Sequence, residues 1–155
     1  PKLIEYLIAV CKESDVSSSQ IVLEISEAEA MRKSAFLVEV LMRLRLKRFD
    51  ISIDKFGSEN MSISALKDMP VTELKVDKAF VSGAVDNSGG RATLEASVAL
   101  AKNLNMKVVA VGVEEHAHWD LVVELGVDYV QGYFLSKPLS GNKITELARN
   151  WTGPH

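Results

Sequence analysis

Short strand-like segments alternate with segments of helical periodicity along this chain, and the alternation restricts its fold more than any other feature. Five segments, at residues 21–25, 51–54, 74–76, 107–111 and 128–130, contain the branched aliphatic residues typical of buried strands. Between them, apolar residues recur three or four positions apart, as on one face of a helix. This order predicts parallel strands joined by helices. We therefore expect one α/β unit without an internal domain boundary.

The helical segments have less distinct ends than the strands. Leu3, Leu7 and Val10 mark one face of a first helix, and further helices are expected near residues 37–44, 63–68, 94–104, 119–123 and 144–151. Residues 86–90 combine Asp, Asn, Ser and two Gly, which is typical of a loop with a turn at Gly89 and Gly90.

The composition argues against several classes of protein. A net charge of −3 over 155 residues indicates no large basic surface, so we expect no binding to DNA or RNA polymers. No apolar run approaches the roughly 20 residues of a membrane-crossing helix, so no membrane segment is predicted. The single cysteine, Cys11, excludes an intrachain disulfide. A cytoplasmic location is expected, for this chain or for a larger signalling protein that contains it.

Polar side chains stand at or just beyond the carboxyl ends of four predicted strands: Glu24, Asp54, Lys75 and Gln131. Ligands bind at this end of parallel strands, both in closed (β/α) barrels and in open α/β sheets. Two carboxylates suit Mg²⁺ or Mn²⁺, a lysine neutralises phosphate, and a carboxamide bonds water or phosphate. The set favours metal-assisted phosphodiester chemistry. The alternative is a structural ion pair between Glu24 and Lys75.

The same strand ends carry a series of short motifs: EISE at 24–27, DKFGS at 54–58, LKVD at 74–77, VAVGVE at 109–114, YVQGY at 129–133 and SKP at 136–138. In this order they resemble E-[IL]-T-E, D-D-F-G-T, L-K-[IV]-D, V-A-E-G-V-E, Y-x-Q-G-Y and [SG]-[RK]-P of the EAL domain family. Each motif alone is weak, but their shared order along the chain is specific. The resemblance covers nearly the whole chain.

The resemblance implies a (β/α)8 TIM-barrel-like fold, of which this chain holds only the C-terminal five or so βα units. Residues 1–152 correspond to the C-terminal portion of an EAL-type domain, without the N-terminal strands and the Glu-Ala-Leu motif, and residues 153–155 form a tail. We expect the chain to be a piece of a longer protein. An open edge strand also invites pairing with a second copy of the chain, so a homodimer is a further expectation.

Active members of the family open cyclic di-GMP to a linear dinucleotide with Mg²⁺ or Mn²⁺. By resemblance, Glu24 and Asp54 stand at metal-ligand positions, and Lys75 stands at the catalytic lysine. The remaining matches are Glu114 as a supporting catalytic carboxylate, Gln131 and Pro138 as ligand-binding residues, and Glu27 as the residue that steadies the loop after the D-D-F-G strand.

Two positions depart from the family pattern. Lys55 replaces the second acid of D-D-F-G, and Val111 replaces the first glutamate of E-G-V-E. At ~4 Å and an effective dielectric of ~20, an ammonium and a dication repel each other by about 8 kcal/mol. An isopropyl group offers no oxygen. Lys55 has two interpretations: it pairs with Asp54, Glu24 or a ligand phosphate, or it extends into solvent.

We therefore expect a response-regulator-like signalling domain with vestigial metal ligands and no bound metal. It would be catalytically inactive and act as a cyclic di-GMP receptor or a protein-interaction module, with weak or absent nucleotide binding in this chain. One alternative is an active Mg- or Mn-dependent phosphodiesterase when full length, supported by Glu24, Asp54, Lys75 and Gln131. Another is a barrel unit that only joins other protein domains.

Overall fold

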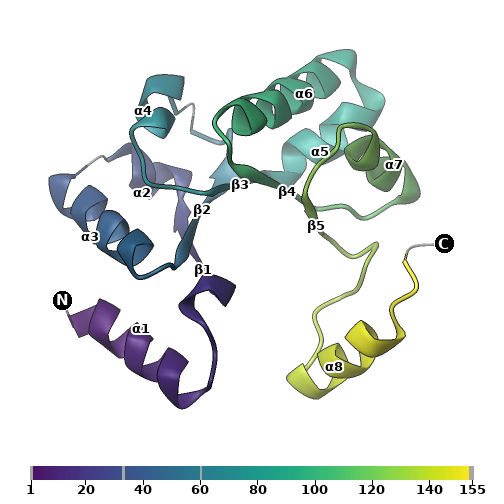
Figure 1. Cartoon of the computed structure of the whole chain (residues 1–155). Coiled ribbons are helices and arrows are strands. Elements are labelled where there is room, and N and C mark those ends of the chain that lie inside the picture. Colours follow the sequence, from purple (N-terminus) through teal and green to yellow (C-terminus); the bar gives the residue numbers. More distant parts are fainter. Residues whose placement is uncertain (1, 33, 60, 154–155) are drawn as a thin grey trace.

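A single parallel sheet forms the centre of the molecule in the computed structural model, which describes residues 2–32, 34–59 and 61–153 (Figure 1). Its strands are β1 (Val22–Ser26), β2 (Asp50–Phe56), β3 (Glu73–Val76), β4 (Lys107–Val111) and β5 (Tyr129–Gln131). They lie in the order β1-β2-β3-β4-β5, and every neighbouring pair is parallel. Sequential order with parallel sense is the arrangement of a (β/α) barrel. The predicted α/β class is confirmed, and the sheet is part of a TIM-barrel-like fold.

Helices connect the strands and cover one side of the sheet. They are α1 (Lys2–Glu13), α2 (Glu27–Met31), α3 (Ala35–Leu46), α4 (Ile63–Lys67), α5 (Lys78–Asp86), α6 (Ser88–Asn103), α7 (His116–Glu124) and α8 (Gly141–Asn150), with a short 3₁₀ helix, η1 (Ser18–Gln20). Figure 1 shows α3 to α7 on one side of the sheet, while α1 and α8 lie at either end of its opposite side.

The core lies between the sheet and the covering helices. Successive side chains of a strand point to opposite faces. Ile51, Ile53, Leu74, Val76 and Val108 are fully buried in this core. Each such side chain contributes about 1.5–3 kcal/mol by leaving water. The intervening residues face the uncovered side of the sheet, which is hollowed into a pocket of about 530 Å³ lined by residues that include Glu24, Lys75 and Gln131.

Polar caps start several helices directly at the strand ends. Ser26 ends β1 and its hydroxyl accepts a hydrogen bond from the Glu29 amide, so α2 begins at once. Asp77 follows β3 and its carboxylate accepts from the Ala79 amide at 2.9 Å, which starts α5. The chain therefore turns sharply at the carboxyl ends of these strands and leaves short loops there.

Two details of the predicted helices are wrong. In α1, Ile4 is the buried residue and Leu7 and Cys11 pack beside it, while Leu3 and Val10 are exposed. Gly89 and Gly90 form no turn, because the Asn87 side chain caps α6 and both glycines lie in its first turn. A Cβ on Gly90 would stand 2.4 Å from the Gly83 carbonyl oxygen, so glycine permits the close packing of α5 on α6.

Candidate functional site at the carboxyl ends of the strands

Three of the four polar residues predicted from the strand ends meet around one ammonium group. The Nζ of Lys75 lies 2.6 Å from Oε1 of Glu24 and 3.8 Å from Oδ1 of Asp54. The Lys75 side chain is only 10% exposed, whereas both acids are more open to solvent. The ion pair that sequence reasoning offered as an alternative is therefore present, and it occupies the space between the two carboxylates.

The position of Glu24 differs from the prediction. It is the third of five residues in β1, where it pairs with Ser52 of β2, and Ser26 ends the strand opposite Asp54. Glu24 consequently lies two residues before the end of β1, and Lys75 links it to Asp54. Its neighbour Ser52 is fully buried, and its hydroxyl has no hydrogen-bond partner among the described residues.

Glu27 organises the loop that follows β2. Its carboxylate is 1% exposed and accepts hydrogen bonds from the amides of Gly57, Glu59 and Met61 at 2.8, 3.0 and 2.8 Å. The Ser58 hydroxyl adds a longer contact at 3.4 Å. A buried carboxylate is costly unless its oxygens are satisfied. Here backbone donors from a single loop satisfy them.

Lys55 stands at an irregular point of β2. The register between β2 and β3 shifts between Ile53 and Phe56, and Lys55 has a φ of 58°. This left-handed conformation is uncommon for a residue other than glycine. The side chain is exposed, and within the described part of the chain it forms no ion pair with Asp54 or Glu24.

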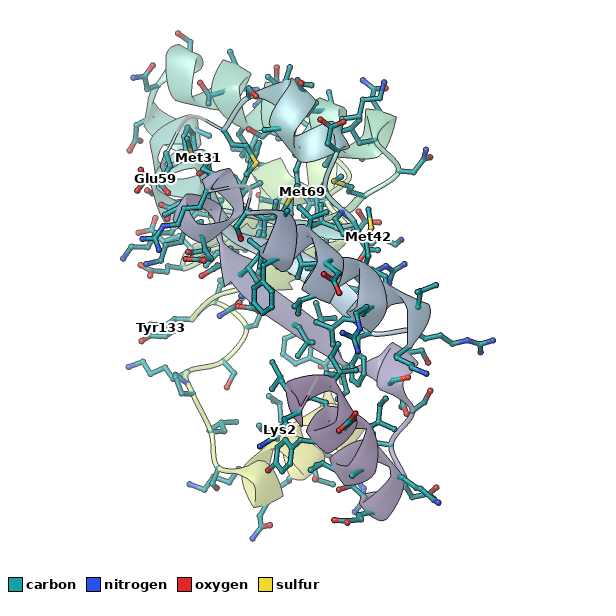
Figure 2. The ribbon with its side chains drawn as sticks, turned by 90° about the vertical axis from the view of Figure 1, so that its left-hand side faces the viewer. Lys2, Met31, Met42, Glu59, Met69 and Tyr133 are labelled. Carbon is teal, nitrogen blue, oxygen red and sulfur yellow. The ribbon has the colours of Figure 1, made fainter. Side chains whose placement is uncertain are left out.

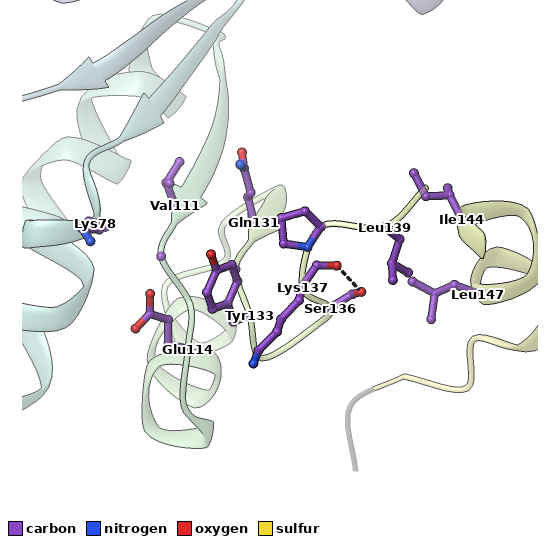
Figure 3. A pocket seen from close by; sticks show the side chains of 13 residues that line it. Lys78, Val111, Glu114, Gln131, Tyr133, Ser136, Lys137, Leu139, Ile144 and Leu147 are labelled. Carbon is purple, nitrogen blue, oxygen red and sulfur yellow. Dashed lines mark hydrogen bonds between the residues drawn. The ribbon is translucent and has the colours of Figure 1, made fainter. Parts of the chain in front are cut away.

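Asp54, Lys55, Lys75, Asp77, Lys78, Val111 and Gln131 line a pocket of about 390 Å³ at the carboxyl ends of the strands. A second pocket, of about 470 Å³, shares Lys78, Val111 and Gln131 with the first and continues past Glu114, Tyr133 and Pro138 to Leu139, Ile144 and Leu147 (Figure 3). We call the two together the rim groove. One end is charged, and the other is largely apolar.

The loop after β5 forms the apolar end of the rim groove. Gly132 approaches Val113 so closely that a Cβ there would meet the Val113 carbonyl oxygen at 1.9 Å. The next residue, Tyr133, extends outward from this loop and is 59% exposed (Figure 2). An exposed aromatic ring beside Pro138 and Leu139 provides a flat apolar surface.

The loop after β4 holds Glu114. Its amide donates to Nδ1 of His118 at 3.3 Å, and its side chain lines the rim groove. Gly112, with a φ of 81°, lies against Lys78, since a Cβ on Gly112 would stand 2.3 Å from Cβ of Lys78. Lys78 was not among the site residues predicted from the sequence, although its position directly after the LKVD motif could have indicated it.

The structure thus brings Asp54, Lys75 and Gln131 into one pocket and Glu114, Gln131 and Pro138 into the adjoining one, with Glu27 behind the loop after β2. Within residues 2–32, 34–59 and 61–153, no group of three or more His, Cys, Asp or Glu side chains is placed to hold a metal ion. Over the same residues, no helix has the length and apolar character required to span a bilayer.

Comparison with known sequences identifies relatives of this chain. The EAL domain model matches residues 1–138. The bifunctional diguanylate cyclase/cyclic di-GMP phosphodiesterase MucR of Pseudomonas aeruginosa is 36% identical over 126 residues, which are 81% of this chain and 18% of MucR. The oxygen sensor protein DosP of Escherichia coli is 33% identical over 129 residues, 83% of this chain and 16% of DosP. The chain thus spans less than a fifth of these curated relatives.

Solved structures give the same result. The cyclic di-GMP complex of the PaMucR phosphodiesterase has a TM-score of 0.85 at 32% identity, covering 92% of this chain and 57% of that chain. The EAL domain of Mycobacterium smegmatis DcpA has a TM-score of 0.85 at 30% identity, covering 94% and 66%. A manganese and cyclic di-GMP complex of Klebsiella pneumoniae BlrP1 has a TM-score of 0.80 at 25% identity, covering 86% and 34%. This chain belongs to the EAL domain family.

Proposed function

We propose that this chain is part of a cyclic di-GMP signalling domain that binds the nucleotide in the rim groove without hydrolysing it. It would act as a receptor or as a protein-interaction module. The observation that carries the proposal is the rim groove itself, in which a lysine-rich end adjoins an apolar, aromatic end. The names of MucR and of its solved complex, which refer to cyclic di-GMP, support the choice of ligand.

A cyclic dinucleotide matches both ends of the rim groove. Its phosphates carry negative charge, which Lys55, Lys75 and Lys78 would neutralise. Its guanine bases are flat and would stack against Tyr133 and contact Pro138, while the Gln131 amide would bond a phosphate or a base edge. Glu27 would preserve this site indirectly, because its bonds fix the loop after β2.

The residues at the charged end do not suit a pair of divalent cations. Lys75 already lies between Glu24 and Asp54, and Lys55 adds a second ammonium next to Asp54 in the chain. Val111, at the end of β4, contributes no oxygen. We propose that Glu24 and Asp54 are vestigial metal ligands and that Lys75 and Glu114 no longer serve catalysis.

A second candidate function is Mg- or Mn-dependent hydrolysis of cyclic di-GMP in a longer form of the protein. It is favoured by Glu24, Asp54 and Lys75, which lie together, and by the manganese and calcium complexes of BlrP1. The readout that separates the candidates is the linear dinucleotide product, which only the second candidate forms.

The binding proposal is tested by titrating cyclic di-GMP into the chain in a calorimeter, with GMP as the control ligand. We expect weak, saturable heat and a rise in melting temperature with the cyclic dinucleotide only. A flat titration together with an unchanged melting temperature would favour a unit that only joins proteins.

We also propose a cytoplasmic location within a larger signalling protein. Light scattering on the same sample tests the homodimer, for which a mass of 17.0 kDa would be the contradicting result.

A further inference from the structure

The loop after β4 is held by a histidine as well as by the sheet. The amides of Gly112 and Val113 both donate to the Gln131 carbonyl of β5, at 2.8 and 3.2 Å. The next amide, that of Glu114, donates to Nδ1 of His118 at 3.3 Å, and it has no other acceptor among the described residues. The last bond of this loop therefore depends on a side chain that can take up a proton.

His118 occupies a capping position at the start of α7. The residue before this helix, Glu115, forms no side-chain cap, and His118 is the third residue of the helix. In a capping box, a Glu or Gln at this position accepts an amide from the helix start. Here the ring of His118, a residue only 9% exposed, accepts the amide of Glu114, one residue earlier. A ring nitrogen accepts only when it carries no proton, so the bond requires neutral His118.

Protonation of His118 would remove this bond. Both ring nitrogens of a protonated histidine are donors, so a second N–H would face the Glu114 amide. The new charge would also lie in the first turn of α7, where the helix dipole is already positive. Histidine is the side chain that changes charge between about pH 8 and pH 5. The bond is consequently present above this range and is lost as the pH falls through it.

The charges around His118 come from three elements besides its own position. The titratable groups of α7, of α5 and the loop after β5, which pack against α7, and of the loop before α7 are Lys78, Asp86, Glu114, Glu115, His116, Asp120, Glu124, Tyr133 and Lys137. Asp120 is already bonded to His116, and Glu124 to Arg91. Glu114 and Glu115 are exposed, so water screens their attraction for a protonated ring.

We propose that His118 makes the loop after β4 sensitive to pH: the neutral ring fixes the Glu114 amide, and the protonated ring releases it. The neighbouring amides of Gly112 and Val113 stay bound to β5. The change is therefore confined to Glu114, whose side chain lines the rim groove (Figure 3). The pH thus alters the lining of the groove and leaves the fold intact. This inference goes beyond the proposed function, because it concerns the free chain and requires no bound nucleotide.

The test follows the Glu114 amide and the His118 ring by NMR from about pH 8 to about pH 5. In the wild type, we expect both signals to move with the same midpoint. His118→Gln keeps an acceptor at every pH, so the Glu114 signal should no longer move over this range. The matched control is His116→Gln on the same helix, an exposed histidine that does not contact the Glu114 amide, and it should leave the Glu114 titration unchanged.

Melting curves give a second readout. Between about pH 7.5 and pH 5.5, the melting temperature of the wild type should fall by about 3 °C more than that of His118→Gln, the shift expected for one hydrogen bond in a chain of this size. Equal falls in both proteins would overturn the inference.

The NMR titration can also contradict the proposal. A Glu114 amide signal that stays in place while the His118 ring titrates, or a ring that does not titrate over this range, would overturn it. If His118→Gln does not fold, His118→Asn, which also offers a side-chain acceptor, takes its place. An absence of heat in the cyclic di-GMP titration would overturn the proposed function and leave this inference standing.

Discussion

The loops after β2 and after β5 leave the same edge of the sheet but are held in different ways. The loop after β2 is bound to a buried carboxylate, Glu27, by three backbone amides. The loop after β5 passes Val113 at Gly132 and leads to α8, a helix without a buried residue that lies apart from the sheet in Figure 1. One loop is fixed by a buried carboxylate. The other is fixed by the close contact of Gly132, by a hydrogen bond from the Phe134 amide to the Val113 carbonyl at 3.0 Å, and by the Phe134 ring against Trp119.

This difference bears on what each loop does in the rim groove. At the charged end, the hydrogen bonds to Glu27 hold the loop that directly follows Lys55. They therefore fix the backbone from which the Lys55 side chain extends. At the apolar end, Tyr133 is exposed and offers a flat ring to the groove. The comparison indicates that one buried side chain orders the loop at the charged end, whereas backbone bonds and the Phe134 ring hold the loop at the apolar end and leave Tyr133 exposed.

The largest expected effect comes from removing the buried carboxylate. Glu27→Ala leaves three loop amides without their acceptor, and we expect the free energy of unfolding to fall by about 3 kcal/mol. Urea denaturation measures the loss. Glu29→Ala is the control, since among the described residues the exposed Glu29 carboxylate pairs with Arg32, and its loss should cost less than about 0.5 kcal/mol. Equal losses in both variants would contradict the role of Glu27.

A smaller effect is expected at the loop after β5. Gly132→Ala places a Cβ against the Val113 backbone, and the shift needed to relieve the clash should cost about 2 kcal/mol. Thermal denaturation checks it. Gly141→Ala at the start of α8 meets no atom within 4 Å and should leave the melting temperature unchanged or slightly raised. A Gly132→Ala variant as stable as the wild type would show that this contact does not fix the loop.

The smallest effect concerns the start of β5, where Asp128 accepts from Lys107 Nζ and from the Val108 amide, both at 2.9 Å. Burial opposes ionisation of Asp128, but these hydrogen bonds outweigh it and lower its pKa below the ordinary 3.8. A lowered pKa stabilises the fold above the unfolded pKa, and this stability is lost as the pH falls through the folded value. Asp128→Asn should therefore cost up to about 1 kcal/mol at pH 7 and progressively less as the pH drops below 4. A constant difference from pH 7 to pH 3, measured by urea denaturation, would contradict this assignment.

Periodicity predicted the strands well and the local irregularities poorly. All five predicted strands occur, with no end shifted by more than two residues and 107–111 unchanged, because a run of branched aliphatic residues is a local signal that depends little on tertiary contacts. The bulge at Lys55, with its left-handed conformation, leaves no such pattern, and neither does the close packing of α5 on α6 that glycine permits at position 90. Helix α5 was missed because its capping Asp77 was assigned only to a family motif.

The residues of the candidate site were likewise predicted only in part from the sequence. The motif resemblance placed Asp54, Lys75, Gln131, Glu114 and Pro138 at one edge, and the structure brings them into the two adjoining pockets. It could not place Lys78, because that side chain enters the pocket only through the sharp turn from β3 into α5 and the space left by Gly112. The roles of these residues remain predictions, since position alone does not establish chemistry.

The central claim is that the charged end of the rim groove binds cyclic di-GMP without cleaving it. Its most direct test is chromatography of cyclic di-GMP after incubation with this protein and Mn²⁺, in the longest available form that contains the chain, with the PaMucR phosphodiesterase as a positive control. We predict that the nucleotide is recovered intact while the control yields the linear dinucleotide. Steady formation of the linear product, lost on Lys75→Met, would contradict the account and establish hydrolysis as the function of this site.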